Sequence, residues 1–452
     1  MKLLTLLIAL LASAGAAFAT PYAYIANRFS NSVSVIDTAT DTVIADIAVG
    51  AGPWGVAVGP GGERAYVTNA FGNSVSVIDG QRLAVVATIP LDSSPTDIAV
   101  SDDGRHVLVT RRDQPGTVSL IDTDSLTVVG SVAVSGSPHA VGFLTQGAFV
   151  PGQGLFLVAI ESASKGSRVV ALNRQLQVVA TSTLGHAPYY PKSVTAAYPD
   201  IFVADWNTGT VASIDTVGPF GMWFAPQFLA LNEIASTLAY TWNISDPNDP
   251  HGELFVITPD TNRVSVVTTR PKPLEKVAVI PVGQNPTGIA ITPAGDKAYV
   301  TNQDDGTVSV IDVHSRSVID TIAVGSGPVS VGQFIQPAAD YVPNRFAFRP
   351  VTGADVSMPL SQNIVVSGSI VVSGINRPTP ISIDCPVGDG FCGFSINGGA
   401  WSKSGEIHWG MSVRVRLRAS AAHLTTTKAT LDIGGRSADF SVTTKAQSKA
   451  GG

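Results

Sequence analysis

A five-residue pattern recurs along most of the chain and limits the folds that this chain can form. It reads Val-Ser-Val-Ile-Asp at 33–37, 75–79 and 308–312, and Val-Ser-Leu-Ile-Asp at 118–122. Weaker copies follow the same alternation of apolar and small residues, at 169–173, 211–215 and 254–258. The copies recur about every 42 residues, or about 52 where a loop is longer, which is the spacing of a repeated supersecondary unit.

Each unit is expected to contain four strands. In the second unit, residues 53–58, 65–69, 74–78 and 84–89 alternate in polarity and are separated by Gly-, Pro- and Asn-containing turns. Such alternation is typical of half-buried strands joined by hairpins. Four strands in about 40 to 45 residues are typical of a β-propeller blade, whereas β-helices and leucine-rich repeats have shorter periods.

Within these units the sequence resembles the YVTN-repeat β-propeller family. The resemblance rests on Tyr-Val-Thr-Asn at 66–69 and 299–302, on Pro-x-Gly strands such as 286–291, and on the Val-Ser-Val-Ile-Asp strands. It extends over residues 22–335. It implies a propeller fold and says little about activity, because these repeat residues are mostly structural.

The two ends of the repeat region complete each other. Residues 22–27 match the second strand of a unit with no inner strand before them, and residues 328–335 match an inner strand with no second strand after it. Pairing these pieces would close a ring and remove its exposed sheet edges. We therefore predict an all-β, seven-bladed β-propeller over residues 20–335, closed by its N- and C-terminal strands.

The first 19 residues predict a signal peptide. Lys2 precedes an apolar run over 3–11, and Ala17-Phe18-Ala19 forms a small-residue cleavage site. This run is too short to span a bilayer, and the rest of the chain has no membrane-spanning segment. The protein is therefore expected in the periplasm or outside the cell.

The net charge of the chain limits the kinds of partner that it is expected to bind. Lys and Arg total 28 against 34 Asp and Glu, a formal net charge of -6. No basic excess is present to neutralise a phosphate backbone, so we expect no nucleic-acid partner.

A second domain is predicted after the repeats. Residues 336–350 contain three prolines and no repeat, and are interpreted as a linker. Residues 351–445 contain short alternating segments, such as 412–418, and resemble the immunoglobulin-like or fibronectin-like modules of bacterial surface proteins. Cys385 and Cys392 are expected to form a local disulfide in an exported protein, and a redox site would need a Cys-x-x-Cys spacing that is missing.

Loops that enter the inner strands and loops that follow the second strands should meet at one face of a propeller. The first group gives the residues after each proline: Trp54, Thr96, His139, Lys192, Gln227, Thr287 and Val329. The second group should carry Asn, and Arg111 and Glu161 depart from that consensus. The binding residues predicted on this face are Trp54, Asn69, Arg111, His139, Glu161, Lys192, Asp205, Trp206, Asn243 and Asn302.

Two functions remain open. The first is a non-catalytic scaffold that binds a protein, a glycan or a cell-envelope component at this face. The second is a hydrolase or lyase in the propeller channel, with His139 and Glu161 as acid–base candidates and a divalent metal as an option. No cofactor or metal ligand is assigned, and the 246–251 loop lacks the spacing of a known Ca²⁺ site. Cys-x-x-Cys-His and Gly-x-Ser-x-Gly motifs are missing.

Overall fold

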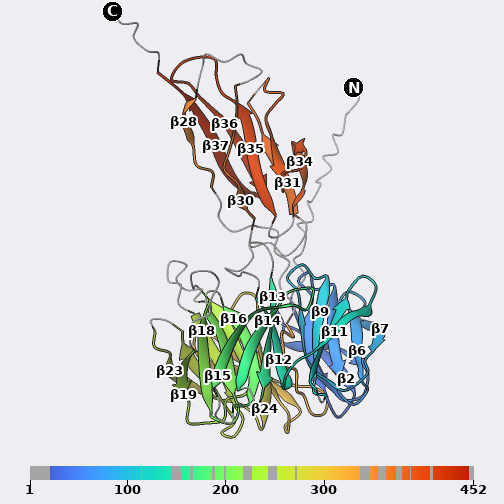
Figure 1. Cartoon of the computed structure of the whole chain (residues 1–452). Helices are drawn as coiled ribbons and strands as arrows, with labels where there is room; N and C mark the ends of the chain where they lie inside the picture. The colour runs from blue at the N-terminus through green and yellow to red at the C-terminus, as the bar shows by residue number, and fades with distance from the viewer. Residues whose placement is uncertain are drawn as a thin grey trace, which may run out of the picture.

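The computed structural model describes residues 21–446, except 114, 145–153, 163–165, 186–188, 198–199, 217–225, 243–251, 270–271, 336–346, 355–362, 373–378, 387 and 408–410. The regular structure of this part consists of strands without helices (Figure 1). Accordingly, no helix there is long and apolar enough to cross a membrane. The predicted signal peptide, 1–19, lies outside the described residues.

Residues 22–323 form antiparallel sheets whose strands follow one another in sequence. We number them in chain order. Sheet 1 contains β1 (Tyr22–Asn27), β2 (Ser32–Asp37) and β3 (Thr42–Ala48). Sheet 2 contains β4 (Pro53–Val58), β5 (Arg64–Asn69), β6 (Ser74–Asp79) and β7 (Ala84–Pro90). Sheet 3 contains β8 (Pro95–Val100), β9 (His106–Arg111), β10 (Thr117–Asp122) and β11 (Thr127–Ala133).

The next four sheets have four strands each. Sheet 4 contains β12 (Ser137–Leu144), β13 (Leu155–Glu161), β14 (Ser167–Leu172) and β15 (Val178–Gly185). Sheet 5 contains β16 (Pro191–Ala197), β17 (Asp200–Asp205), β18 (Thr210–Asp215) and β19 (Gln227–Ala230). Sheet 6 contains β20 (Leu238–Trp242), β21 (Gly252–Thr258), β22 (Arg263–Thr268) and β23 (Glu275–Pro281). Sheet 7 contains β24 (Pro286–Ile291), β25 (Lys297–Asn302), β26 (Thr307–Asp312) and β27 (Ser317–Ala323).

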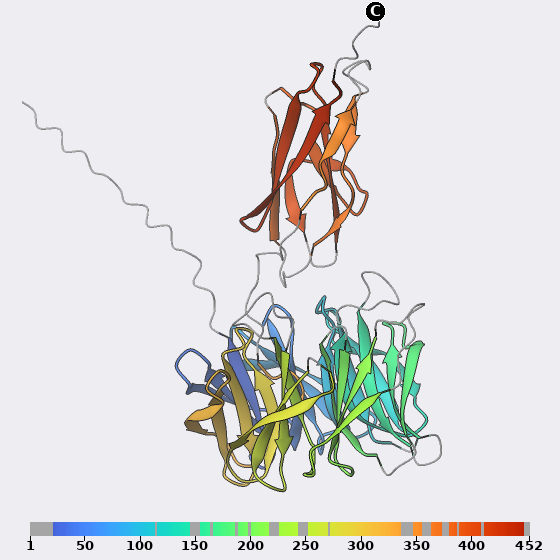
Figure 2. The same ribbon diagram turned by 90° about the vertical axis from the view of Figure 1, so that its left-hand side faces the viewer.

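The core of this region lies between neighbouring sheets. One cluster, for example, joins Leu108 and Leu120 of sheet 3 to Phe156 and Val158 of sheet 4. Inner and middle strands are mostly buried, while the outer strands β3, β7 and β23 alternate between exposed and partly buried residues. Successive four-stranded sheets packed face to face in this way form a β-propeller (Figure 2).

The Tyr-Val-Thr-Asn segment is explained by three structural contacts. In sheet 7 the Thr301 hydroxyl accepts a hydrogen bond from the Gly288 amide at 2.8 Å, where the inner strand is irregular. The Asn302 side-chain amide donates to Thr307 and Ser309 at 3.0 and 2.9 Å, which ties the second strand to the third.

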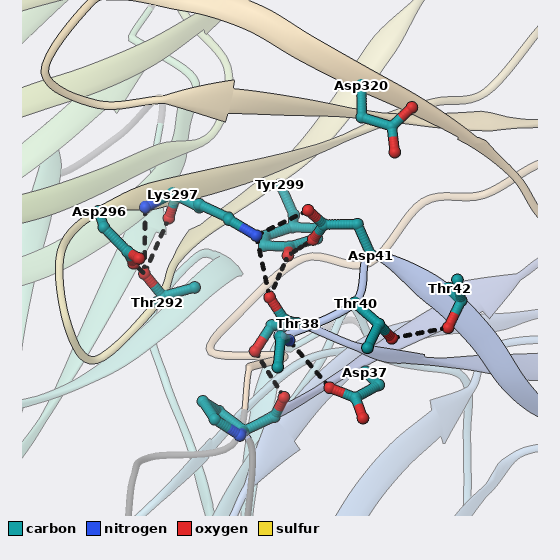
Figure 3. Close-up of polar contacts among 12 residues, drawn as sticks. Asp37, Thr38, Thr40, Asp41, Thr42, Thr292, Asp296, Lys297, Tyr299 and Asp320 are labelled. Carbon is teal, nitrogen blue, oxygen red and sulfur yellow. Dashed lines mark hydrogen bonds and ion pairs between the residues drawn. The ribbon is translucent and has the colours of Figure 1, made fainter.

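The tyrosine of this segment joins adjacent sheets. Lys297 Nζ donates to Asp41 Oδ2 at 2.6 Å, and the buried Tyr299 hydroxyl donates to the other oxygen of Asp41 (Figure 3). Lys297 Nζ also donates to the carbonyl oxygen of Thr38 at 3.0 Å. These contacts link sheet 7 to sheet 1, the last sheet to the first.

The segment 328–335 lies against β1. The Tyr24 amide donates to the Phe334 carbonyl and the Val329 amide donates to the Ala26 carbonyl, both at 2.9 Å. Its bridges to β1 are antiparallel. Residues from both ends of the repeat region thus lie side by side at sheet 1.

Sheet 6 differs from the sequence prediction. We expected 254–258 to be a third strand, but these residues belong to β21, the second strand, and β22 is the third. Likewise Gln227 begins β19, an outer strand with an exposed side chain, rather than an inner strand. The longer loops around these strands lack the regular spacing that located the other copies.

Beyond the propeller, two further sheets share one apolar core. The first has the order β28 (Val351–Ala354), β37 (Arg436–Thr444), β36 (Thr426–Ile433), β31 (Thr379–Asp384) and β34 (Ser404–Ile407). The second has the order β29 (Ile364–Val366), β35 (Ser412–Arg418), β32 (Gly393–Ile396) and β33 (Trp401–Ser402), with β30 (Ile370–Val371) also paired to β35.

The alternation along β35 matches the sequence pattern. Val413, Val415 and Leu417 are buried in a cluster that also contains residues of the other sheet. Cys385 and Cys392 form the predicted disulfide.

Candidate functional site

The strand registers bring the two predicted groups of loops to the same end of the sheets. Pro53 pairs with Asn69 in sheet 2, and Pro191 pairs with Asp205 in sheet 5. The start of each inner strand thus lies beside the end of the second strand. We call this end the binding face.

Sheet 6 follows this pattern, but its strands differ from those that we predicted. Trp242 pairs with Gly252 at the start of β21, so β20 is the inner strand and ends away from the binding face. Asn243, which we expected at the end of a second strand, follows β20 instead and itself lies outside the described residues.

A group of cations and aromatic rings gathers on the binding face. We call it the cation–aromatic cluster, and it consists of Arg28, Trp54, Arg112, Tyr190, Lys192 and Trp206. Lys192 Nζ lies 5.5 Å from the ring centre of Trp54, 5.9 Å from that of Tyr190 and 5.8 Å from that of Trp206. These distances fit cation–π attraction.

Trp54 and Tyr190 extend the cluster to further sheets. The Arg28 guanidinium lies 4.6 Å from the ring centre of Trp54, and the Arg112 guanidinium lies 5.9 Å from that of Tyr190. Arg28 follows β1 and Arg112 follows β9, so the cluster draws on sheets 1, 2, 3 and 5.

His139 and Glu161 form a pair beside this cluster. His139 Nε2 lies 2.8 Å from Glu161 Oε2, and the imidazole ring centre lies 4.1 Å from that of Tyr190. Burial lowers the pKa of His139 to about 4, and the positive charges of Arg112 and Lys192 act in the same direction against Glu161. The imidazole is therefore neutral at pH 7 and donates its Nε2 proton to the carboxylate.

A buried carboxylate that the sequence reasoning missed lies on the same inner strands. Asp97 accepts hydrogen bonds from the Ile98 amide at 2.8 Å and from the Val141 amide of the next sheet at 2.9 Å. Burial raises its pKa to about 6. It occupies the position that is Gly55 in sheet 2 and Gly288 in sheet 7, so departure from the repeat consensus would have identified it.

The same comparison would have found other members of the cluster. Arg28 and Arg112 each follow the last residue of a second strand, where sheet 2 has Ala70 and sheet 7 has Gln303.

Four predicted binding residues make polar contacts within the fold, and each also keeps one buried side-chain atom that has no hydrogen-bond partner among the described residues. Asn69 and Asn302 are fully buried, and their amides bond to hydroxyls of their own third strands. Arg111 is also buried, 3.4 Å from an Asp92 oxygen and 3.8 Å from an Asp113 oxygen. Asp205 accepts hydrogen bonds from the amide and hydroxyl of Thr208 at 2.9 and 2.7 Å.

The remaining predicted residues, Trp54, His139, Glu161, Lys192 and Trp206, lie together at the binding face. Trp54, Trp206 and Lys192 supply aromatic rings and positive charge there, whereas the neutral His139 imidazole is only 2% exposed. Among the described residues, no group of three or more His, Cys, Asp or Glu side chains is arranged to hold a metal ion. The 246–251 loop, which lacks the spacing of a known Ca²⁺ site, lies outside those residues.

Comparison with known proteins supports the fold. Residues 57–148 match the YNCE-like beta-propeller family model. No curated protein sequence matches the chain. The chain is therefore similar to a propeller family over part of its repeat region.

Solved structures extend this likeness. Hydrazine synthase of Kuenenia stuttgartiensis is 21% identical with a TM-score of 0.55, covering 64% of this chain and 91% of that one. A functionally unknown protein of Desulfotomaculum acetoxidans is 15% identical, also with a TM-score of 0.55, covering 69% of this chain and 99% of that one. At these identities the likeness concerns the fold.

Proposed function

We propose that this protein is an exported, non-catalytic β-propeller scaffold that binds a protein, glycan or cell-envelope component at the binding face. The propeller would have seven blades, with segment 328–335 completing the blade of sheet 1. The two C-terminal sheets would be an immunoglobulin-like sandwich joined by the linker, and residues 1–19 would direct export to the periplasm or the exterior.

The cation–aromatic cluster is the observation that supports binding. The fold does not require large or charged residues at these positions, since the residue after the inner-strand proline is Thr287 in sheet 7 and Val329 in segment 328–335. Trp54 and Lys192 replace such small residues in sheets 2 and 5. Trp, Tyr and Arg, the residue types of every cluster member except Lys192, are enriched among the residues that contribute most to binding energy at interfaces.

A capture experiment tests this proposal. The exported form of the chain, residues 20–452, would be immobilised and exposed to extract from its own cell envelope. We expect Trp54→Ala to reduce the amount of the bound component, and the matched variant Thr287→Ala to leave it unchanged. If the folded wild type and folded Trp54→Ala captured equal amounts, the binding face would not be the site of binding, and the proposal would be wrong.

The hydrolase or lyase alternative is supported by the His139–Glu161 pair. A neutral imidazole held 2.8 Å from a carboxylate is able to accept a proton from a substrate on its other nitrogen. The test is turnover of a panel of esters, lactones and glycosides by the wild type and by His139→Ala, with the metal content measured by mass spectrometry. Turnover that His139→Ala abolishes without unfolding would support this alternative over the scaffold.

A further inference from the structure

Three positive charges of the cation–aromatic cluster have no carboxylate at ion-pair distance among the described residues. Among the described residues, Arg28, Arg112 and Lys192 make cation–π contacts, and no carboxylate forms an ion pair with any of them.

Some cations elsewhere in the propeller do have such partners. Lys272 Nζ lies 2.6 Å from an Asp200 oxygen, and Arg174 lies 2.9 Å from an Asp102 oxygen. Acidic residues are also present on the binding face, where Glu161 bonds to His139 and Asp92 and Asp113 lie beside Arg111. Among the described residues, none of these carboxylates forms an ion pair with Arg28, Arg112 or Lys192.

Three positive charges held close together are electrostatically unfavourable unless a negative charge lies nearby. Burial lowers the pKa of Lys192, and the charges of Arg112 and Arg28 lower it further. Asp97 opposes this effect, but its two oxygens accept hydrogen bonds from backbone amides. A cationic group kept half-buried at such a cost is characteristic of functional sites.

The aromatic rings fix where these charges lie. Trp54 is shared by Arg28 and Lys192, and Tyr190 is shared by Lys192 and Arg112. The rings hold the three cations close to one another on the binding face. They do not supply enough hydrogen-bond acceptors for all the N–H groups of these cations. Each guanidinium group carries five N–H donors and the ammonium carries three, so donors remain for a ligand.

We infer that the cation–aromatic cluster binds an oxyanion, a carboxylate or phosphate group of a small ligand, through Lys192, Arg28 and Arg112. This inference rests on the proposed binding function and specifies its ligand chemistry. Oxyanions accept charge-assisted hydrogen bonds from guanidinium and ammonium groups, and Arg offers two parallel donors to such a group. The negative net charge of the chain favours one or two anionic groups over an extended polyanion.

The test is isothermal titration calorimetry of residues 20–452 with inorganic phosphate and with succinate. We expect at least one of these probes to bind, and Lys192→Met and Arg28→Gln each to weaken it about tenfold or more. The probe that binds more tightly identifies phosphate or carboxylate as the preferred group. Arg82→Gln is the matched control, because Arg82 is 77% exposed and pairs with Asp79 away from the cluster.

Circular dichroism and the unfolding midpoint verify that the variants are folded. Binding of neither probe up to millimolar concentration, or equal binding by wild type and both cluster variants, would overturn the inference. The oxyanion inference can fail while the proposed binding function still holds, and the experiments distinguish the two cases. If Trp54→Ala loses the envelope component while Lys192→Met and Arg28→Gln retain it, the face binds a ligand that is not an anion.

Discussion

The contact between sheets 7 and 1 gives a quantitative test of how the propeller is held together. We predict that Asp41→Asn destabilises the protein. Asp41 accepts hydrogen bonds from Lys297 and Tyr299, one on each oxygen. An Asn side chain has a single oxygen, so one of these donors would face an NH₂ group instead.

The size of the effect follows from burial. Tyr299 is fully buried, and the side chains of Lys297 and Asp41 are 20% and 15% exposed. Leaving a buried donor unpaired costs about 1–3 kcal/mol, and removing the charge weakens the remaining bond. We therefore expect a loss of about 2–3 kcal/mol. Asn tolerates the backbone at this position, where φ is 55°, so the substitution adds no backbone strain.

Urea unfolding followed by circular dichroism measures this loss through the midpoint and slope of the transition. Asp320→Asn is the control, because Asp320 is exposed and lies apart from the network (Figure 3). Tyr299→Phe alone should cost about 1–2 kcal/mol, and the double variant should cost less than the sum, since both changes remove one bond. Strict additivity, or a change from Asp41→Asn no larger than that of the control, would refute this account of the contact.

Three further predictions concern the binding face and the C-terminal sheets. Lys192→Met should raise stability at pH 7 by about 0.5–2 kcal/mol, because it removes an unpaired half-buried charge; a loss of stability in urea unfolding would contradict this. His139 should titrate near pH 4 by NMR, and stability should fall as the pH drops from about 6.5 to 4, where the unfolded chain binds the extra proton. This fall should lessen in His139→Gln. Reducing Cys385–Cys392 should destabilise the C-terminal sheets by about 2–3 kcal/mol in differential scanning calorimetry, and leave the propeller transition unchanged.

The sequence predicts the propeller because the repeated residues have repeated structural roles. Thr301 and Asn302 make the same kinds of contact wherever the segment recurs, so their spacing reports the sheets directly. Sheet 6 lacks this segment, and its strands were displaced in our prediction. A degraded apolar run such as 254–258 fits a second strand and a third strand equally well, and its hydrogen-bond partners decide between them.

The binding face was only partly predictable for a different reason. Trp54 and Lys192 follow prolines at a fixed repeat position, so they were found by comparing units. Asp97 lies one residue farther along, where its carboxylate spans two inner strands, and that depends on how closely the strands approach. The absence of acidic partners for Arg28, Arg112 and Lys192 among the described residues is a property of three-dimensional packing that no single unit reveals.

The central claim is that the cation–aromatic cluster holds a ligand. Native mass spectrometry of residues 20–452, after exposure to cell-envelope extract, measures this most directly. We predict an added mass on the wild type and on Thr287→Ala that is lost from Trp54→Ala and from Lys192→Met. The same added mass on all four proteins, or none on the wild type, would contradict the claim.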